Sequence, residues 1–139
     1  MNSIRAIVLA GVSHLMITTA FAADNAVIRA NAAAGVAAIK ACIAPIGNPF
    51  HESRGYAMMH LAIHDALNAI DRRYQPYAYD TKAEPGTSPD AAVAAAAYYV
   101  LAPTIQALPE DILHGDGCSK ENGTAVTEAA LHTKKSGHR

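Results

Sequence analysis

Four polar residues that could do chemistry recur along one stretch of the sequence: His60, His64, Asn68 and Asp71. If this stretch is helical, they form one stripe, because positions three or four residues apart share a helical face. The His60–His64 spacing suits a metal ion held from one helix, but a metal needs a third or fourth ligand, and HExxH is not formed. We therefore expect both rings to make helix–helix hydrogen bonds, with Asp65, Asn68 or backbone groups as partners. A His60/His64 metal site is the weaker alternative.

Asp65 is flanked by apolar residues and is expected to be buried in a structural role, since a buried carboxylate needs a partner. Arg54, Arg72 and the tyrosines of the following loop are the candidate partners. Asp71 is too far along the helix to form a close carboxylate pair with Asp65. The sequence contains neither GxSxG nor a Gly-rich phosphate loop. We therefore assign no catalytic, cofactor-binding or metal-binding residue.

The elements that position these residues are expected to be helices only, because no run of strand-type alternation occurs. The sequence predicts helices at 25–42, 53–72, 89–102 and 124–134, with one or two short turns between 104 and 113. Their predicted N-caps are Asp24, Ser53, Ser88 and Thr124, and Pro103 is expected to end the third helix. Residues 74–87 are expected to form a loop that packs along the surface. The central helix should bury a stripe made of Tyr56, Met59, Ile63, Ala66, Leu67 and Ile70.

Composition suits one small globular domain: 139 residues, 51% hydrophobic and 17% charged, with a formal net charge of −1. This balance excludes a basic nucleic-acid-binding stripe, so no nucleic-acid partner is expected. Residues 1–22 have the pattern of a cleaved export signal, which predicts a periplasmic or secreted protein with no membrane contact after cleavage. An oxidising compartment permits a Cys42–Cys118 disulfide; burial of Cys42 as a free thiol is the alternative.

Three stretches carry a family resemblance: AMMHLAIHDALNAI at 57–70, YQPY at 74–77 and SPDAA at 88–92, with a weaker GTAVTEAAL at 123–131. Together they resemble the N-terminal helices of secreted bacterial vanadium-dependent haloperoxidases, members of the type-2 phosphatidic acid phosphatase superfamily. The resemblance implies an all-α helical bundle, incomplete here, with a signal peptide at 1–22, the N-terminal helical region at 23–113 and a polar C-terminal segment at 114–139 that includes a short helix.

Chemistry in that family requires residues that do not match here. The family holds vanadate, or phosphate in its phosphatase relatives, with a Lys-x6-Arg-Pro motif, a Pro-Ser-Gly-His motif and a later Arg/His motif. This sequence has no Arg-Pro dipeptide, and Ser136–His138 matches the second motif without its proline. We therefore expect a haloperoxidase-like N-terminal fragment, inactive alone, with no cofactor of its own.

Two alternative functions are compatible with the same sequence, and a partner is also expected. The chain is alternatively a non-enzymatic periplasmic helical module, or an acid-phosphatase-type hydrolase of the same superfamily. The hydrolase would build its oxyanion site from Arg54, Arg72, Arg73 and the histidines. The partner expected for the chain is either a second copy of itself or a missing C-terminal half.

Overall fold

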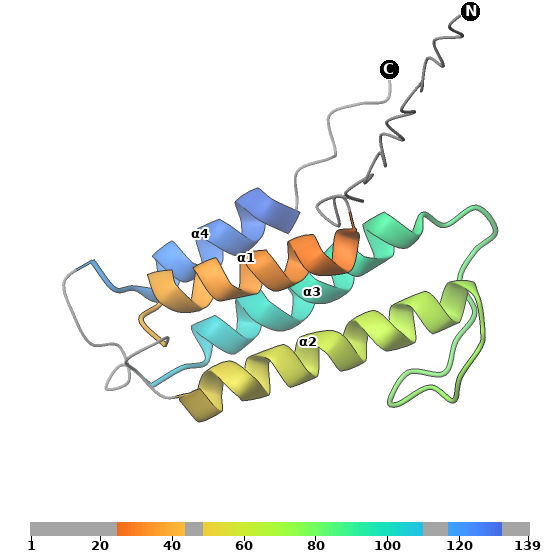
Figure 1. Cartoon of the computed structure of the whole chain (residues 1–139), viewed down its shortest axis with the longest axis horizontal. Coiled ribbons are helices and arrows are strands. Elements are labelled where there is room, and N and C mark those ends of the chain that lie inside the picture. Colours follow the sequence, from red (N-terminus) through yellow and green to blue (C-terminus); the bar gives the residue numbers. More distant parts are fainter. Residues whose placement is uncertain (1–24, 44–48, 110–116, 132–139) are drawn as a thin grey trace, which may run out of the picture.

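The computed structural model describes residues 25–43, 49–109 and 117–131. Over these residues the chain forms helices α1 (Ala26–Lys40), α2 (Pro49–Ile70), α3 (Pro89–Gln106) and α4 (Lys120–Leu131), and no strand. The all-α prediction is therefore confirmed. Figure 1 shows α1 and α4 side by side, α3 against both, and α2 on the far side of α3 from α4. No helix in the described part is long and apolar enough to cross a membrane.

Helix α1 presents a face of small side chains to its neighbours. Its buried residues are all alanines: Ala30, Ala33, Ala34, Ala37 and Ala38. Asn25 is the N-cap, because its side chain accepts a hydrogen bond from the Val27 N–H at 2.8 Å. The prediction that Asn25 would be the first helical residue is thus wrong by one position, and Asp24 lies outside the described residues. The helix ends at Lys40, two residues earlier than predicted, and Cys42 then adopts a left-handed φ of 55°.

Helix α2 begins at Pro49, four residues before the predicted cap Ser53. Pro49 suits the first turn, where no backbone donor is needed. Ser53 lies inside the helix, and its hydroxyl donates to the Pro49 carbonyl at 2.8 Å instead of capping the end. The predicted core stripe is confirmed at Met59 and Ile63, which are buried, and at Tyr56 and Leu67, which pack against the core. Ala66 and Ile70 are only half-buried.

Helix α3 starts where the sequence predicted, with the Ser88 side chain accepting from the Ala91 N–H at 3.4 Å and Pro89 in the first turn. The predicted end at Ala102 is wrong, because Pro103 lies inside the helix. A proline near the last turn removes one backbone hydrogen bond. Continuing the helix buries Ile105 and brings Leu108 into a second apolar cluster with α1, which compensates for that loss.

Helix α4 starts four residues before the predicted cap Thr124. The Ser119 hydroxyl accepts from the Asn122 N–H at 3.0 Å, so Ser119 caps the first turn. Gly123 is buried on α1: a Cβ built on it would lie 2.8 Å from Ala41 Cβ and 3.1 Å from the Ala37 carbonyl oxygen. A glycine at this position therefore permits the close packing of α4 on α1.

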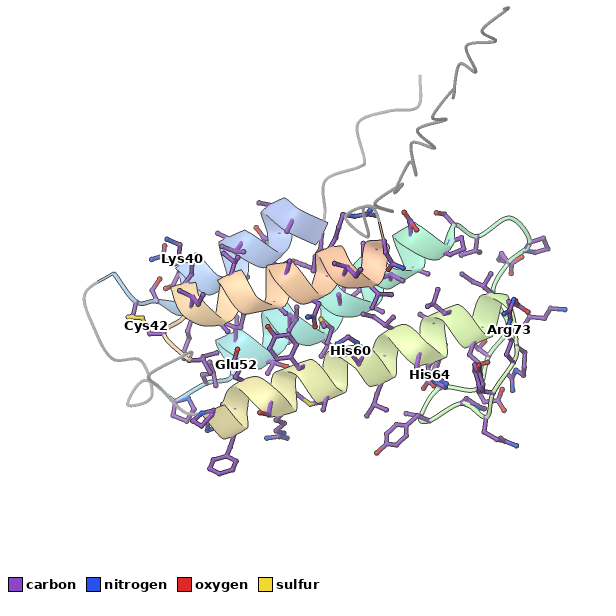
Figure 2. All side chains as sticks on the ribbon, in the orientation of Figure 1. Lys40, Cys42, Glu52, His60, His64 and Arg73 are labelled. Carbon is purple, nitrogen blue, oxygen red and sulfur yellow. A yellow bond between two sulfur atoms is a disulfide. The ribbon has the colours of Figure 1, made fainter. Side chains whose placement is uncertain are left out.

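Cys42 and Cys118 form a disulfide, so the first of the two alternatives for these cysteines is the one observed. Their Cα atoms are 5.4 Å apart, and 76 residues separate them in sequence. Figure 2 shows Cys42 just beyond the Lys40 end of α1. The bridge joins this end of α1 to the segment that leads into α4.

Candidate functional site

The polar stripe of α2 does not converge on one site. His60 is exposed, and its Nε2 lies 3.0 Å from Asn31 Oδ1 on α1, so the predicted helix–helix hydrogen bond is confirmed for this ring, with a partner that was not among those predicted. His64 lies with its Nδ1 3.1 Å from Oδ1 of Asp65, one of its predicted partners, but both residues belong to α2, so the helix–helix part of the prediction is wrong for this ring. Asp71 pairs on the surface with Arg73. Figure 2 shows His60 on the α1 side of α2 and His64 nearer the end that carries the loop.

The buried centre of this region is the Asp65 carboxylate, which is 5% exposed. Its Oδ1 accepts from the Tyr77 N–H at 2.7 Å, and its Oδ2 accepts from the N–H groups of Ala78 and Tyr79, each at 2.8 Å. The expected partner is thus found in the tyrosine loop and not in Arg54 or Arg72, although the donors are backbone groups. Three successive N–H groups around one carboxylate form an anion-binding concavity.

The same donors determine the ionisation of Asp65. Hydrogen bonds from the Tyr77 and Ala78 N–H groups, with smaller contributions from Tyr79 and His64, hold the pKa of the Asp65 carboxyl far below its usual value. Burial acts in the opposite direction but is outweighed. Asp65 is therefore ionised at neutral pH, and both of its oxygens already accept hydrogen bonds from the loop.

Asn68 is the second anchor of the loop and is 4% exposed. Its Oδ1 accepts from the N–H groups of Arg73 at 2.9 Å and Tyr74 at 3.0 Å. Its Nδ2 donates to the Tyr74 carbonyl at 2.8 Å. The side chain thus satisfies backbone groups just past the C-terminal end of α2, a capping role that the sequence reasoning missed. The available signal was an asparagine three residues after a buried aspartate and close to the end of the helix.

Further contacts fix the remainder of this loop, which contains no helix or strand, as predicted. The Ala83 N–H donates to the Ala69 carbonyl at 2.9 Å, and the Arg72 guanidinium pairs with Asp80. The backbone of the loop is therefore held against α2 at several points (Figure 1). Its three aromatic rings nevertheless face solvent and are about two-thirds exposed: Tyr74, Tyr77 and Tyr79.

No metal-binding cluster is formed by the described residues: nowhere in 25–43, 49–109 and 117–131 do three His, Cys, Asp or Glu side chains gather as ligands. A metal on His60 and His64 would find no third ligand there. Ser136–His138, the partial match to a vanadate-site motif, lies outside the described residues.

Two hollows border α2. The inner one, about 30 Å³, lies between α2 and the α1 and α3 helices. Its polar lining residues are His51, Glu52, Tyr56 and Thr104, and the others are apolar. Burial, and then the charge of Glu52, raise the pKa of the Tyr56 hydroxyl. The outer hollow, about 420 Å³, is a groove between the outer face of α2 and the loop. The inner hollow has room for water only, whereas the groove could accept a large side chain.

Comparison of the chain with protein-family models, with curated proteins and with solved structures gives no match.

Proposed function

We propose that this chain is the N-terminal helical unit of an exported, vanadium-haloperoxidase-like protein, and that it acts as a scaffold without vanadate chemistry of its own. One observation carries the proposal. Two of the stretches that carry the family resemblance, 57–70 and 74–77, are joined by the buried hydrogen bonds of Asp65 and Asn68. The shared residues thus have a role in shaping a helix–loop unit, which is what a scaffold requires.

The distribution of charge supports a role without catalysis. A multiply charged oxyanion such as vanadate needs several fixed cationic donors around one point. Arg72 and Arg73 are each neutralised by a carboxylate, Asp80 and Asp71 respectively. Export is supported by the disulfide between α1 and α4, since such bonds persist in oxidising compartments.

The test is to sequence the DNA downstream of the Arg139 codon in all three frames. An Arg-Pro motif and a Pro-Ser-Gly-His motif encoded there would support a haloperoxidase origin, and their lack would sink it. The scaffold role is tested separately by titrating vanadate into the purified chain and following the ⁵¹V NMR signal. We expect no saturable binding and no peroxide-dependent bromide oxidation, and either one would refute the proposal.

A non-enzymatic helical module is the second candidate, and the continuity of the core favours it. α1, α2 and α3 share one buried cluster, and α1 and α3 share another beside α4. A chain with this core should unfold in one cooperative transition, whereas a fragment whose core faces are exposed should not. Thermal unfolding followed by circular dichroism and calorimetry separates the two, and a module requires that calorimetric and van't Hoff enthalpies agree.

The phosphoester hydrolase remains the third interpretation, and the arrangement of its arginines gives it little support. Arg54 lies near the beginning of α2 and Arg72 just past its end, about 27 Å away along a helix of that length. If the interpretation holds, Arg72→Ala with Arg73→Ala must abolish phosphate-ester turnover. We expect no turnover above background in either protein.

A further inference from the structure

The inner hollow between α1, α2 and α3 contains polar side chains to which the described part of the fold gives no partner. Glu52 and Tyr56 both line it, and Figure 2 shows Glu52 on the side of α2 that faces α1. Within residues 25–43, 49–109 and 117–131, neither the Glu52 carboxylate nor the Tyr56 hydroxyl has a hydrogen-bond or salt-bridge partner. Half-buried polar groups beside apolar walls favour an occupant that completes their hydrogen bonds.

The hollow also has space that no side chain fills. Its volume is about 30 Å³, whereas one water molecule needs roughly 10–15 Å³, so about two water-sized groups fit. Gly55 lines the hollow and is buried, yet a Cβ built on it would meet no atom within 4 Å. A glycine inside a helix is less stable than an alanine. Gly55 therefore keeps open a space that packing alone would favour filling.

The polar groups of the hollow are chiefly hydrogen-bond acceptors. The Thr104 hydroxyl donates to the Val100 carbonyl at 2.6 Å, so only its lone pairs remain for an occupant. The Glu52 carboxylate can only accept, and the Tyr56 hydroxyl can accept as well as donate. The occupant that completes this set is therefore a donor of several hydrogen bonds.

The charges around the hollow favour a cation. Among the described residues that line it, Glu52 is the only acidic one, and none is Lys or Arg. Ala38 and Ile105 bring the last turns of α1 and α3 to the hollow, and a helix dipole is negative at that end. The first turn of α2 has the opposite sign, but it carries Glu52 itself. His51, the remaining polar lining residue, adds a positive charge only when it is protonated.

We propose that the inner hollow binds an ammonium cation, either the free ion or the –NH₃⁺ group of a short primary amine. An ammonium group is close to water in size, so it fits the available space. It offers N–H donors in several directions, and its charge strengthens the hydrogen bond to Glu52. This inference concerns the interior of the helical bundle and does not depend on the proposed function.

The first test follows the backbone amides of Gly55 and Tyr56 in two-dimensional NMR spectra of the ¹⁵N-labelled full chain, disulfide intact, at neutral pH. Ammonium chloride is titrated to about 100 mM at constant ionic strength, with sodium chloride as the balance, so that screening stays the same. We expect saturable shifts of both amides with ammonium and with methylammonium. Saturation with ammonium alone would identify the free ion, and tighter binding of methylammonium would identify an amine group as the ligand.

Two further cations test the basis of recognition. Potassium is similar in size to ammonium but donates no hydrogen bond, and tetramethylammonium carries the charge without N–H groups in a larger volume. Neither should cause a saturable shift. Equal binding of potassium, or no saturable shift with ammonium and methylammonium, would overturn the proposal.

Two variants remove the site in different ways. Glu52→Gln keeps the length of the side chain and should raise the dissociation constant about tenfold or more, because a charge-assisted hydrogen bond is lost. Gly55→Ala keeps the charge, fills the space and should abolish binding while the chain stays folded. Glu84→Gln is the matched control, since Glu84 is exposed in the loop after α2, and it should bind as the wild type does. Undiminished binding in Glu52→Gln would contradict the site.

Discussion

Gly123→Ala is the sharpest test of how α4 packs on α1. The added methyl would lie 2.8 Å from Ala41 Cβ, against an ordinary carbon–carbon contact of about 3.5–4.0 Å. It would also lie 3.1 Å from the Ala37 carbonyl and 3.3 Å from Ile105 Cγ2. The Ala37 carbonyl belongs to α1 and Ala41 is the C-cap of that helix, so neither atom can rotate away. α4 would therefore have to move off α1.

The expected cost follows from two opposing effects. Overpacking of this kind costs about 1–3 kcal/mol, and the higher helix propensity of alanine returns up to about 1 kcal/mol. We expect a net loss of about 1–2 kcal/mol in the free energy of unfolding, or roughly 5–10 °C in melting temperature for a domain of this size.

Gly55→Ala is the matched control, since it makes the same change inside another helix. A Cβ on Gly55 meets nothing within 4 Å, because this glycine borders the inner hollow. Only the propensity gain remains, so stability should rise by about 0.5–1 kcal/mol. Urea unfolding of the full chain, followed at 222 nm, gives both values. If Gly123→Ala is as stabilising as Gly55→Ala, the close approach of α4 to α1 is wrong.

Three further outcomes are expected. Asp65→Asn should release the 74–79 loop, because an amide cannot accept all of the N–H groups that the carboxylate accepts; chymotrypsin should then cut the loop faster, while the surface variant Asp71→Asn should be cut at the wild-type rate. Because the pKa of Asp65 is lower in the folded chain than in the unfolded chain, the unfolded chain takes up the proton first as the pH falls. The contribution of ionised Asp65 to the free energy of unfolding is therefore present above about pH 4 and declines below it. Urea unfolding of Asp65→Asn should accordingly depend less on acid than urea unfolding of the wild type. Replacing Cys42 and Cys118 with serine removes a cross-link between residues 76 positions apart. The entropy gained by the unfolded chain predicts a decrease of about 4 kcal/mol in the free energy of unfolding measured in urea. A decrease under about 1 kcal/mol would contradict this estimate.

The sequence predicted the helices well where local chemistry decides and less well where packing decides. Ser88 followed by Pro89 located the start of α3 to the residue, because a cap depends on side chains next to it in sequence. Pro103 did not end that helix, because the gain from burying Ile105 depends on α1, which sequence patterns near Pro103 do not reveal. Ser53 looked like a cap for the same local reason, yet the helix already begins at Pro49.

For the candidate site, residue types were predictable and partners were not. The burial of Asp65 followed from its apolar neighbours, but its donors are backbone N–H groups twelve to fourteen residues further on, which no side-chain pattern identifies. The four-residue spacing of His60, His64 and Asn68 predicted that they share one face of a helix. In the structure, however, their side chains contact α1, Asp65 and the loop respectively. The spacing of residues along a helix predicts which face they share, but the hydrogen-bond partner of each side chain depends on the neighbouring elements of the fold.

The Asp65 anchor also explains how the loop can shape an apolar surface. A flexible loop would pay conformational entropy whenever Tyr79 and Ala78 were ordered against a partner. Here the carboxylate has already fixed both backbone positions, at 2.8 Å each, before any partner arrives. One wall of the groove is therefore preorganised, which reduces the entropic cost of binding. By this reasoning Asp65→Asn should speed hydrogen exchange at the Ala78 and Tyr79 amides, because their N–H groups lose part of their acceptor. Exchange at these two amides as slow as in the wild type would show that the carboxylate does not preorganise this wall of the groove.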